Sequence, residues 1–326
     1  MKTIEKQIRK YVDENIKPTQ DENNEVSEHY SEISHLLEKH GYYTFRTWSY
    51  ARWTAISPVN DLDIICESDN QDIADFMNWE KWEWLYRILS EKYWEDNIDF
   101  QSHSIGITFP DNEGDFSIDV VIAQKIEELN EFGSNLYIVP TFLYKTKAQR
   151  IEIYKNIKEN WGDINLKKSD PKWYKKQMKE IKDGNDSIIY ATRLLKKWKC
   201  WIKESYYMEN ERFLKSFHLE EILKKQAVSD TNLDILWLLN AWITNANLSF
   251  ANIPDRADKD VMIDWYIDDE NFDNNRAWKH LLSLGDELWM ITESNVEEII
   301  SKILLIKKVE KQVSIGNKQK SYYAIN

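Results

Sequence analysis

The pattern of hydrophobic and polar positions changes near residue 150. Before it, short apolar runs and alternations predict strands at Tyr42–Thr47, Asp61–Cys66, Ile98–Phe100, Ser104–Phe109 and Phe116–Ile122, and helical periodicity predicts a long helix over Asp72–Tyr93. After it, nearly every apolar pattern has the period of a helix, as in SIIYATRLLKKWKCWI, FLKSFHLEEILKK and LDILWLLNAWI. We therefore expect an α+β protein with a mixed lobe at residues 1–150, a helical lobe at 151–326 and a cleft between them.

Two apolar segments bear on membrane attachment. The first, Lys2–Lys17, carries apolar residues at helical spacing rather than the continuous apolar run of a signal peptide. The longest uncharged stretch, Ile235–Pro254, contains four asparagines, which favour a core helix over a membrane span. We expect no membrane association.

Composition narrows the possible partners. The chain has 326 residues, 30% of them charged, and a net charge of −13. Such an acidic protein does not coat long nucleic acid, although a local basic groove could bind triphosphates. Its two cysteines, Cys66 and Cys200, form no disulfide framework and no metal-binding spacing, which favours a reducing, cytoplasmic compartment.

Two carboxylates alternate with apolar residues in the segment NDLDIIC. On a strand, Asp61 and Asp63 point to one face while Leu62 and Ile64 enter the core. Two acids on one face repel unless a cation lies between them, and oxygen ligands favour Mg²⁺ or Mn²⁺. The isolated pair is more often a solvated strand edge, and DKD at Asp258–Asp260 has the same pattern.

A third acid changes this interpretation. In FSIDVVIA, Asp119 lies between apolar neighbours, where a buried charge is costly without a partner. Three carboxylates can share divalent ions, and phosphoryl transfer with two metal ions uses such a trio. The alternative is a strand-end acid paired with a lysine.

The turn before the acids completes a family pattern. Ser49 follows the first predicted strand, and its hydroxyl and the backbone N–H groups after it could cradle a phosphate. The motifs SYAR-x-TAI, DLDI and IDVVIA resemble the core of the polymerase-β-like nucleotidyltransferases. The resemblance is closest to the bacterial cGAS/DncV-like nucleotidyltransferases, or CD-NTases.

The second half carries the same resemblance. The segments ATRLLKKWK, LKSFHLEEIL and YIDDENFDNN are similar, in order and spacing, to the helical lobe that this family shares with oligoadenylate synthetases. SIGITF, before the third acid, also resembles the corresponding strand, and the similarity covers roughly residues 1–305. It implies a polymerase-β-like lobe and a helical lobe, with the first helix packed on the helical lobe.

The resemblance also implies roles for individual residues. Asp61, Asp63 and Asp119 match a triad that binds two Mg²⁺ or Mn²⁺ ions, Ser49 matches a phosphate contact, and Thr54 falls in the same turn. Lys196 matches a lysine that faces the triphosphate, and Lys215 with Ser216 matches a second contact; a solvated basic helix face is the alternative for both lysines. Glu220 is expected to be structural.

The family reaction is sequential nucleotidyl transfer from nucleoside triphosphates, including ATP, which closes a cyclic oligonucleotide for antiphage (CBASS) signalling. The product acts on a downstream effector, and some relatives are activated by a partner protein. Two alternatives remain: a catalytically inactive nucleotide-binding relative, and an enzyme that modifies RNA ends or a toxin protein. The acidic charge and the lack of an RNA-binding appendage disfavour the last of these.

Two tryptophans depart from the family pattern. Trp48 and Trp53 occupy positions before the serine and before the threonine where the family has glycine, which lets the backbone approach phosphates. We expect their indoles to enter the cleft above Asp61 and Asp63 or to displace the Thr47–Ser49 backbone. The chain has 15 Trp and only 8 Gly. One hypothesis is therefore a stop codon that the source reads as glycine but that was translated as tryptophan; the other is a true pseudoenzyme.

Overall fold

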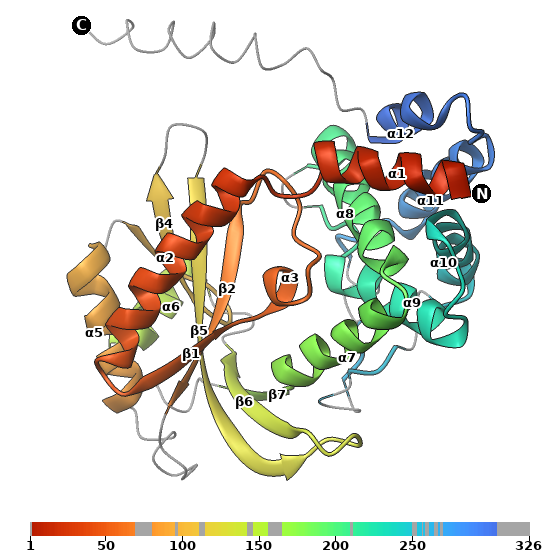
Figure 1. Ribbon diagram of the computed structural model, residues 1–326. Coiled ribbons are helices and arrows are strands. Elements are labelled where there is room, and N and C mark those ends of the chain that lie inside the picture. Colours follow the sequence, from red (N-terminus) through yellow and green to blue (C-terminus); the bar gives the residue numbers. More distant parts are fainter. Residues whose placement is uncertain are drawn as a thin grey trace, which may run out of the picture.

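The computed structural model describes residues 2–68, 80–94, 97–110, 115–141, 146–155, 165–208, 211–249, 253–255, 257, 261–263, 267 and 270–304. Figure 1 shows a part built around a twisted sheet beside a part built from helices. The N-terminal helix lies on the helical side, and the next helix lies on the sheet side.

The sheet has the strand order β1-β2-β5-β4-β3, and β6 and β7 continue it from the far end of the long β5. β2 and β5 are parallel, and the other pairs are antiparallel. The strands are β1 (Tyr42–Arg46), β2 (Asp61–Ser68), β3 (Ile98–Phe100), β4 (Ile105–Pro110), β5 (Asp115–Leu129), β6 (Asn135–Thr141) and β7 (Asn165–Ser169).

The two faces of the sheet differ in what covers them. Side chains of α2 (Gln20–Glu38) and α5 (Glu80–Tyr93) form a common core with Leu62, Ile64 and their neighbours on β5 and β4. Because side chains alternate along a strand, Asp61 and Asp63 point to the opposite face. The short helix α3 (Trp48–Ala51) lies against β2, and α6 (Lys147–Lys155) lies near β3.

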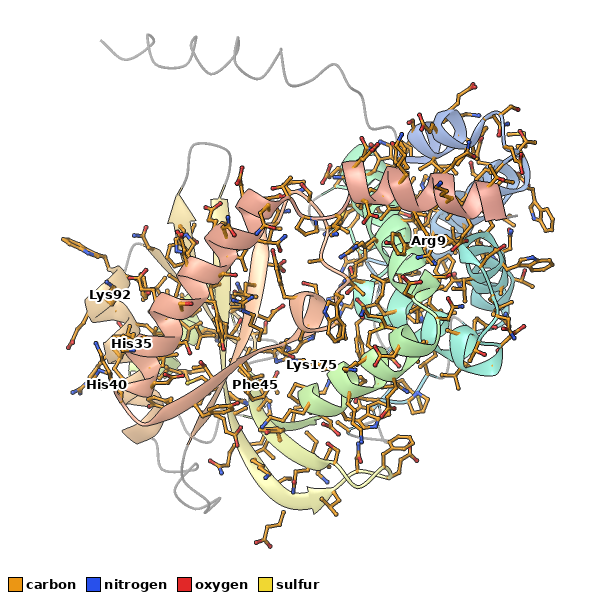
Figure 2. The ribbon with its side chains drawn as sticks, viewed as in Figure 1. Arg9, His35, His40, Phe45, Lys92 and Lys175 are labelled. Carbon is orange, nitrogen blue, oxygen red and sulfur yellow. The ribbon has the colours of Figure 1, made fainter. Side chains whose placement is uncertain are left out.

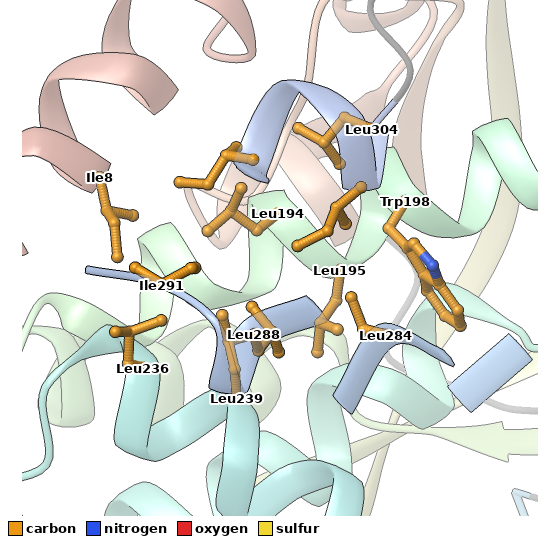
Figure 3. A pocket seen from close by; sticks show the side chains of 12 residues that line it. Ile8, Leu194, Leu195, Trp198, Leu236, Leu239, Leu284, Leu288, Ile291 and Leu304 are labelled. Atoms are coloured by element: carbon orange, nitrogen blue, oxygen red, sulfur yellow. The ribbon is translucent and has the colours of Figure 1, made fainter. Parts of the chain in front are cut away.

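The helical part has its own core. It contains α7 (Pro171–Gly184), α8 (Ser187–Tyr206), α9 (Ser216–Ser229), α10 (Ile235–Ser249), α11 (Asn274–Trp289) and α12 (Val296–Leu304). The first helix, α1 (Lys2–Asn15), contacts α8, α10 and α12. Ile8 and Val12 of this helix, and Ile16 just after it, are buried among the apolar side chains of the helical core. Figure 3 shows a pocket in this core that only apolar side chains line, with Ile8 at one side and Trp198 at the other.

The two parts also meet at α7. Figure 2 labels Phe45 on β1 and Lys175 on α7, on the two sides of this junction. One turn before Lys175, the Lys172 ammonium lies 4.7 Å from the centre of the Phe45 ring and 3.2 Å from Glu67 Oε2. α7 therefore contacts the sheet as well as the helices.

The five predicted strands are confirmed, with β2 and β5 longer than expected. The predicted helix Asp72–Tyr93 is present as α5 from Glu80, and residues 72–79 lie outside the described residues. The sequence did not indicate β6, which contains a proline, or the polar β7. Since β7 pairs with β6, the sheet-containing part extends to Ser169 rather than ending near residue 150.

Among the helices in the described ranges, none combines the length and the apolar character needed to cross a membrane.

The packing of α1 predicts that Ile8→Ala destabilises the helical core. Ile8 is fully buried, and truncation to alanine at such a site costs about 2–5 kcal/mol in the free energy of unfolding. Lys10→Ala, on the exposed side of the same helix, should change it by less than about 0.5 kcal/mol. Urea unfolding measures both; equal midpoints for the two variants would show that α1 is not part of the core.

Candidate functional site

The three predicted metal-binding acids lie on one face of the sheet. Asp63 on β2 is directly opposite Asp119 on the parallel strand β5, and Asp61 is two residues earlier on the same face. The row continues from Asp119 to Gly106 on β4 and then to Asp99 on β3. The fold therefore brings together acids that are separated by more than fifty positions in sequence.

These carboxylates affect one another electrostatically. Burial raises the pKa of Asp63 well above its usual value, and the charges of Asp61 and Asp119 raise it further. Burial also raises the pKa of Asp119 to about 6, with contributions from Asp61 and Asp99, although a hydrogen bond from Gln101 opposes the shift. A cation would relieve this repulsion, and a set of carboxylate oxygens suits Mg²⁺ or Mn²⁺.

The side chains are not gathered around a metal position as they stand. In the described part of the chain, no three Asp, Glu, His or Cys side chains are close enough together to hold an ion. Asp119 Oδ1 instead accepts a hydrogen bond of 2.9 Å from Gln101 Nε2. The role of the three acids as metal ligands stays a prediction that their shared face and their repulsion support.

Gly106 leaves room for this hydrogen bond. A Cβ atom at residue 106 would lie 2.9 Å from Gln101 Nε2 and 3.1 Å from Asp119 Oδ1. Both distances are shorter than ordinary van der Waals contact. A Cβ atom at this position of β4 would therefore push the flexible end of the Gln101 side chain away from Asp119.

The turn between β1 and β2 begins beside the acids. The Thr47 N–H donates to the Asp63 carbonyl at 3.0 Å, which continues the pairing of β1 with β2 to the start of α3. Ser49 lies in α3, and its carbonyl accepts the Thr54 N–H at 2.9 Å. The predicted contacts Ser49 and Thr54 thus belong to one closed turn next to Asp63.

A buried ion cluster joins this turn to the helical part. Glu220 of α9 is completely buried, and its Oε2 and Oε1 lie 2.8 Å from Arg52 Nε and 2.6 Å from Lys196 Nζ. The Thr54 hydroxyl donates to Glu220 Oε1 at 2.9 Å and accepts from Lys196 Nζ at 2.9 Å. Burial opposes the charge of Glu220, but Arg52 and Lys196 outweigh it and hold its pKa at about 2.

This cluster places Lys196 and Thr54 beside the site but engages them with protein groups. Both are buried, and the positive charges of Arg52 and Lys196 lie near enough to Asp63 to offset part of the rise in its pKa. Their roles as nucleotide contacts stay predictions. The sequence predicted a structural role for Glu220 but did not indicate that it pairs with Lys196.

Lys199 is a residue that the sequence analysis missed. It lies one helical turn after Lys196, and its Nζ donates to the Ser216 hydroxyl at 2.9 Å. Burial lowers the pKa of Lys199, and the nearby ammonium groups of Lys196 and Lys203 contribute, while Asp61 acts in the opposite direction. The sequence could have indicated Lys199, because residues three apart on a helix share a face and Lys199 follows Lys196 by three positions.

Lys215 and Ser216 lie at the start of α9. Lys215 is exposed at the N-cap position, and Ser216 is the first residue of the helix. Burial lowers the pKa of His103, which lies between β3 and β4. The charge of Lys167 lowers it further, and that of Lys215 adds a smaller effect in the same direction. The roles of Lys215 and Ser216 as nucleotide contacts stay predictions.

The two tryptophans take different directions. Trp48 packs against Ile65, Val121 and their neighbours on the face of the sheet that carries the acids. Trp53 packs instead on the helical core, with Lys182 Nζ 5.1 Å from the centre of its ring. The Trp53 indole therefore does not enter the space above the acids, because the apolar helical core accommodates its ring. A displacement of the turn by these residues stays a prediction.

Comparison with known proteins agrees with this arrangement. Residues 1–135 match the model of the Second Messenger Oligonucleotide or Dinucleotide Synthetase domain. The fold is similar to that of CdnC from E. coli MS115-1 with ATP, at a TM-score of 0.64 and 15% identity over 92% of this chain and 97% of that one. It is also similar to the fold of the Vibrio cholerae DncV cyclic AMP-GMP synthase, at a TM-score of 0.56 and 11% identity over 81% of this chain and 68% of that one.

A third similar structure is the complex of the same E. coli CdnC with HORMA-deltaN, at a TM-score of 0.62 and 15% identity over 92% of this chain and 96% of that chain. No curated protein matches the sequence. The resemblance to the CD-NTases and the α+β fold of two lobes, both stated from the sequence, are confirmed.

We predict that Gly106→Ala displaces Gln101 from Asp119. The added Cβ overlaps the amide nitrogen at the flexible end of the Gln101 side chain, so the free energy of unfolding should fall by about 0.5–1.5 kcal/mol, the contribution of the lost hydrogen bond. Gly184→Ala is the matched control, since nothing lies within 4 Å of its Cβ position. Adding Gln101→Ala should recover part of the loss, and strictly additive effects in urea unfolding would contradict the contact.

We also predict that Glu220→Gln destabilises the protein strongly. It leaves Arg52 and Lys196 buried without their counter-charge, which costs about 3–5 kcal/mol in the free energy of unfolding. Glu180→Gln, in the exposed pair with Lys176, should cost no more than about 1 kcal/mol.

The effect of Glu220→Gln should depend on pH in a defined direction. The pKa of Glu220 is lowered from 4.5 to about 2 by folding, so its stabilising contribution is complete above about pH 5 and declines as the pH falls toward 2. Urea titrations at several pH values measure the gap between wild type and variant. A gap that widens as the pH falls would refute this assignment.

Proposed function

We propose that this chain, whose first 135 residues match the second-messenger synthetase domain, is a nucleotidyltransferase that joins nucleoside triphosphates into a cyclic oligonucleotide. One observation carries the proposal: Asp61, Asp63 and Asp119 share the sheet face beside a turn that the helical part holds through Lys196 and Glu220. Acids from one lobe and lysines from the other are what a metal-bound triphosphate requires.

Asp61, Asp63 and Asp119 would hold two Mg²⁺ or Mn²⁺ ions. Such ions neutralise phosphate charge and lower the pKa of an attacking hydroxyl when bound. Asp63 fits this role because its charged form is disfavoured by burial and by two neighbouring acids, so added positive charge stabilises it. Asp119 would exchange its hydrogen bond with Gln101 for a contact to the ion.

The helical part would bind the triphosphate. Lys199 and Ser216 already contact each other, and Lys215 precedes Ser216 at the start of α9. These groups, with Lys196, would position the β- and γ-phosphates while Ser49 and Thr54 hold the turn. A ribose hydroxyl of one nucleotide attacks the α-phosphorus of another, the bond to the bridging oxygen breaks and pyrophosphate leaves; repetition within one molecule closes the ring.

The biological setting that we propose is antiphage (CBASS) signalling in the cytoplasm, where the product acts on a downstream effector. This setting is what the sequence resemblance to the CD-NTases implies, and the fold is similar to that of CdnC and of the DncV cyclic AMP-GMP synthase. CdnC was solved with HORMA-deltaN, and a regulatory partner for this chain is part of the proposal. Neither a membrane nor a long nucleic acid is required for this activity.

One observation favours a second candidate function, an inactive nucleotide-binding relative. Trp48 packs on the acid-bearing face next to Asp63 and Asp119, where its indole takes space that a nucleotide would use. The two functions differ in a measurable way, because an inactive relative binds nucleotide without forming product.

We predict that Trp48→Gly with Trp53→Gly raises the yield of cyclic product from labelled triphosphates and Mg²⁺ at least tenfold. The substitutions free the acid-bearing face and remove two side chains from the turn. A phosphatase-resistant small product measured by chromatography supports the proposal, whereas labelled RNA or labelled protein would support an enzyme that modifies macromolecules.

The matched control is Asp61→Asn in the same double-glycine background. It removes one proposed metal ligand of nearly the same shape, so synthesis should fall by about 10²-fold or more. Unchanged synthesis after this substitution would remove Asp61 from the site. Nucleotide binding without product in the double-glycine protein would favour the inactive relative instead.

A further inference from the structure

Three tryptophans have a left-handed backbone. The φ angles of Trp48, Trp53 and Trp94 are 47°, 61° and 65°. In the described ranges, the other residues with positive φ are Gly41 and Gly133. Every left-handed position identified there is thus a glycine or a tryptophan.

The steric preferences of tryptophan do not favour a left-handed backbone. An L-residue in the left-handed region brings its Cβ too close to the following carbonyl oxygen, and a bulky side chain there is an outlier. Asn and Asp enter this region more readily because their short side chains form local hydrogen bonds. The chain is rich in both, yet tryptophan holds these positions.

Trp94 has the same left-handed backbone although it lies outside the candidate site. It is the first residue after α5, its N–H donates to the Ser90 carbonyl at 3.1 Å, and its carbonyl accepts the Asn97 N–H at 3.1 Å. Its side chain is 76% exposed, so packing does not compensate for the backbone strain. Left-handed glycine is the usual residue at such a helix end.

Trp48 and Trp53 repeat the pattern inside the turn. Trp48 begins α3, and the Trp53 N–H donates to the Tyr50 carbonyl at 3.4 Å after α3 ends. Their side chains point to different parts of the molecule, so no common contact explains why both are tryptophan. What the three positions share is the backbone conformation.

We infer that the natural protein has glycine at positions 48, 53 and 94. A UGA codon explains all three, since it differs by one base from the tryptophan codon UGG and from the glycine codon GGA. A source that reads UGA as glycine would yield tryptophan when its gene is translated with a code that assigns UGA to tryptophan. The low count of 8 Gly beside 15 Trp agrees with this.

The inference rests on backbone geometry and not on the proposed function. The family pattern raised the question for residues 48 and 53, whereas Trp94 is identified by its φ angle alone. Its consequence for the site is direct: with glycine at position 48, the sheet face beside Asp63 loses the indole, and the turn forms without strain.

Peptide sequencing of the protein purified from its source tests the identity of the residues. Cleavage after Arg46 and Arg52 releases the peptide 47–52, a second peptide begins at residue 53, and cleavage after Lys92 releases a third that contains residue 94. We expect glycine at 48, 53 and 94, with UGA codons in the gene. Tryptophan in these peptides, or UGG codons, would overturn the inference.

Thermal unfolding of the expressed chain tests the geometry independently. Trp94→Gly should raise Tm by about 2–4 °C, because glycine relieves the left-handed strain. Trp94→Ala should raise it less, since alanine keeps the Cβ. Trp237→Gly is the control: it is 53% exposed but lies inside α10, where glycine should lower Tm. A Trp94→Gly protein that melts no higher than the unmodified chain would contradict the argument for position 94.

Discussion

The arrangement of this site depends on one buried carboxylate. Glu220 lies between the sheet and the helices, and it pairs with Arg52 from the turn and with Lys196 from α8, while Thr54 completes the cluster. Glu220 is the one anion between these two buried cations, so its removal leaves both of them without a counter-charge. The cluster therefore fixes where the turn lies relative to α8 and, through the pairing of Thr47 with Asp63, where the acids lie.

Much of the sheet was predictable because its pattern is local. Alternation places Asp61 and Asp63 on one face whatever else the fold does, and apolar runs predicted five strands, among them the two that carry the three acids. The register that sets Asp63 opposite Asp119 is not local, since it depends on pairing between distant strands. β7 is polar and has no periodic signal, and its place at the edge depends on β6.

The helical contribution to the site was less predictable for the same reason. A lysine on a helix has the same pattern whether it faces solvent, a phosphate or a buried glutamate, so only the fold shows that Lys196 meets Glu220 and that Lys199 meets Ser216. The tryptophans show the opposite case. The sequence already showed an unusual excess of tryptophan over glycine. The positive φ angles supply the physical reason why glycine suits these positions.

We propose that acids of the sheet and lysines of α8 and α9 hold one metal-bound triphosphate between them. Anomalous diffraction from Mn²⁺ in crystals of the protein with glycine at 48 and 53, grown with a nonhydrolysable ATP analogue, tests this claim most directly. We expect Mn²⁺ peaks at Asp61, Asp63 and Asp119, about 3.5–4 Å apart, with the terminal phosphates at Lys199 and Ser216. Manganese away from these acids, or phosphates that do not touch the helical part, would contradict it.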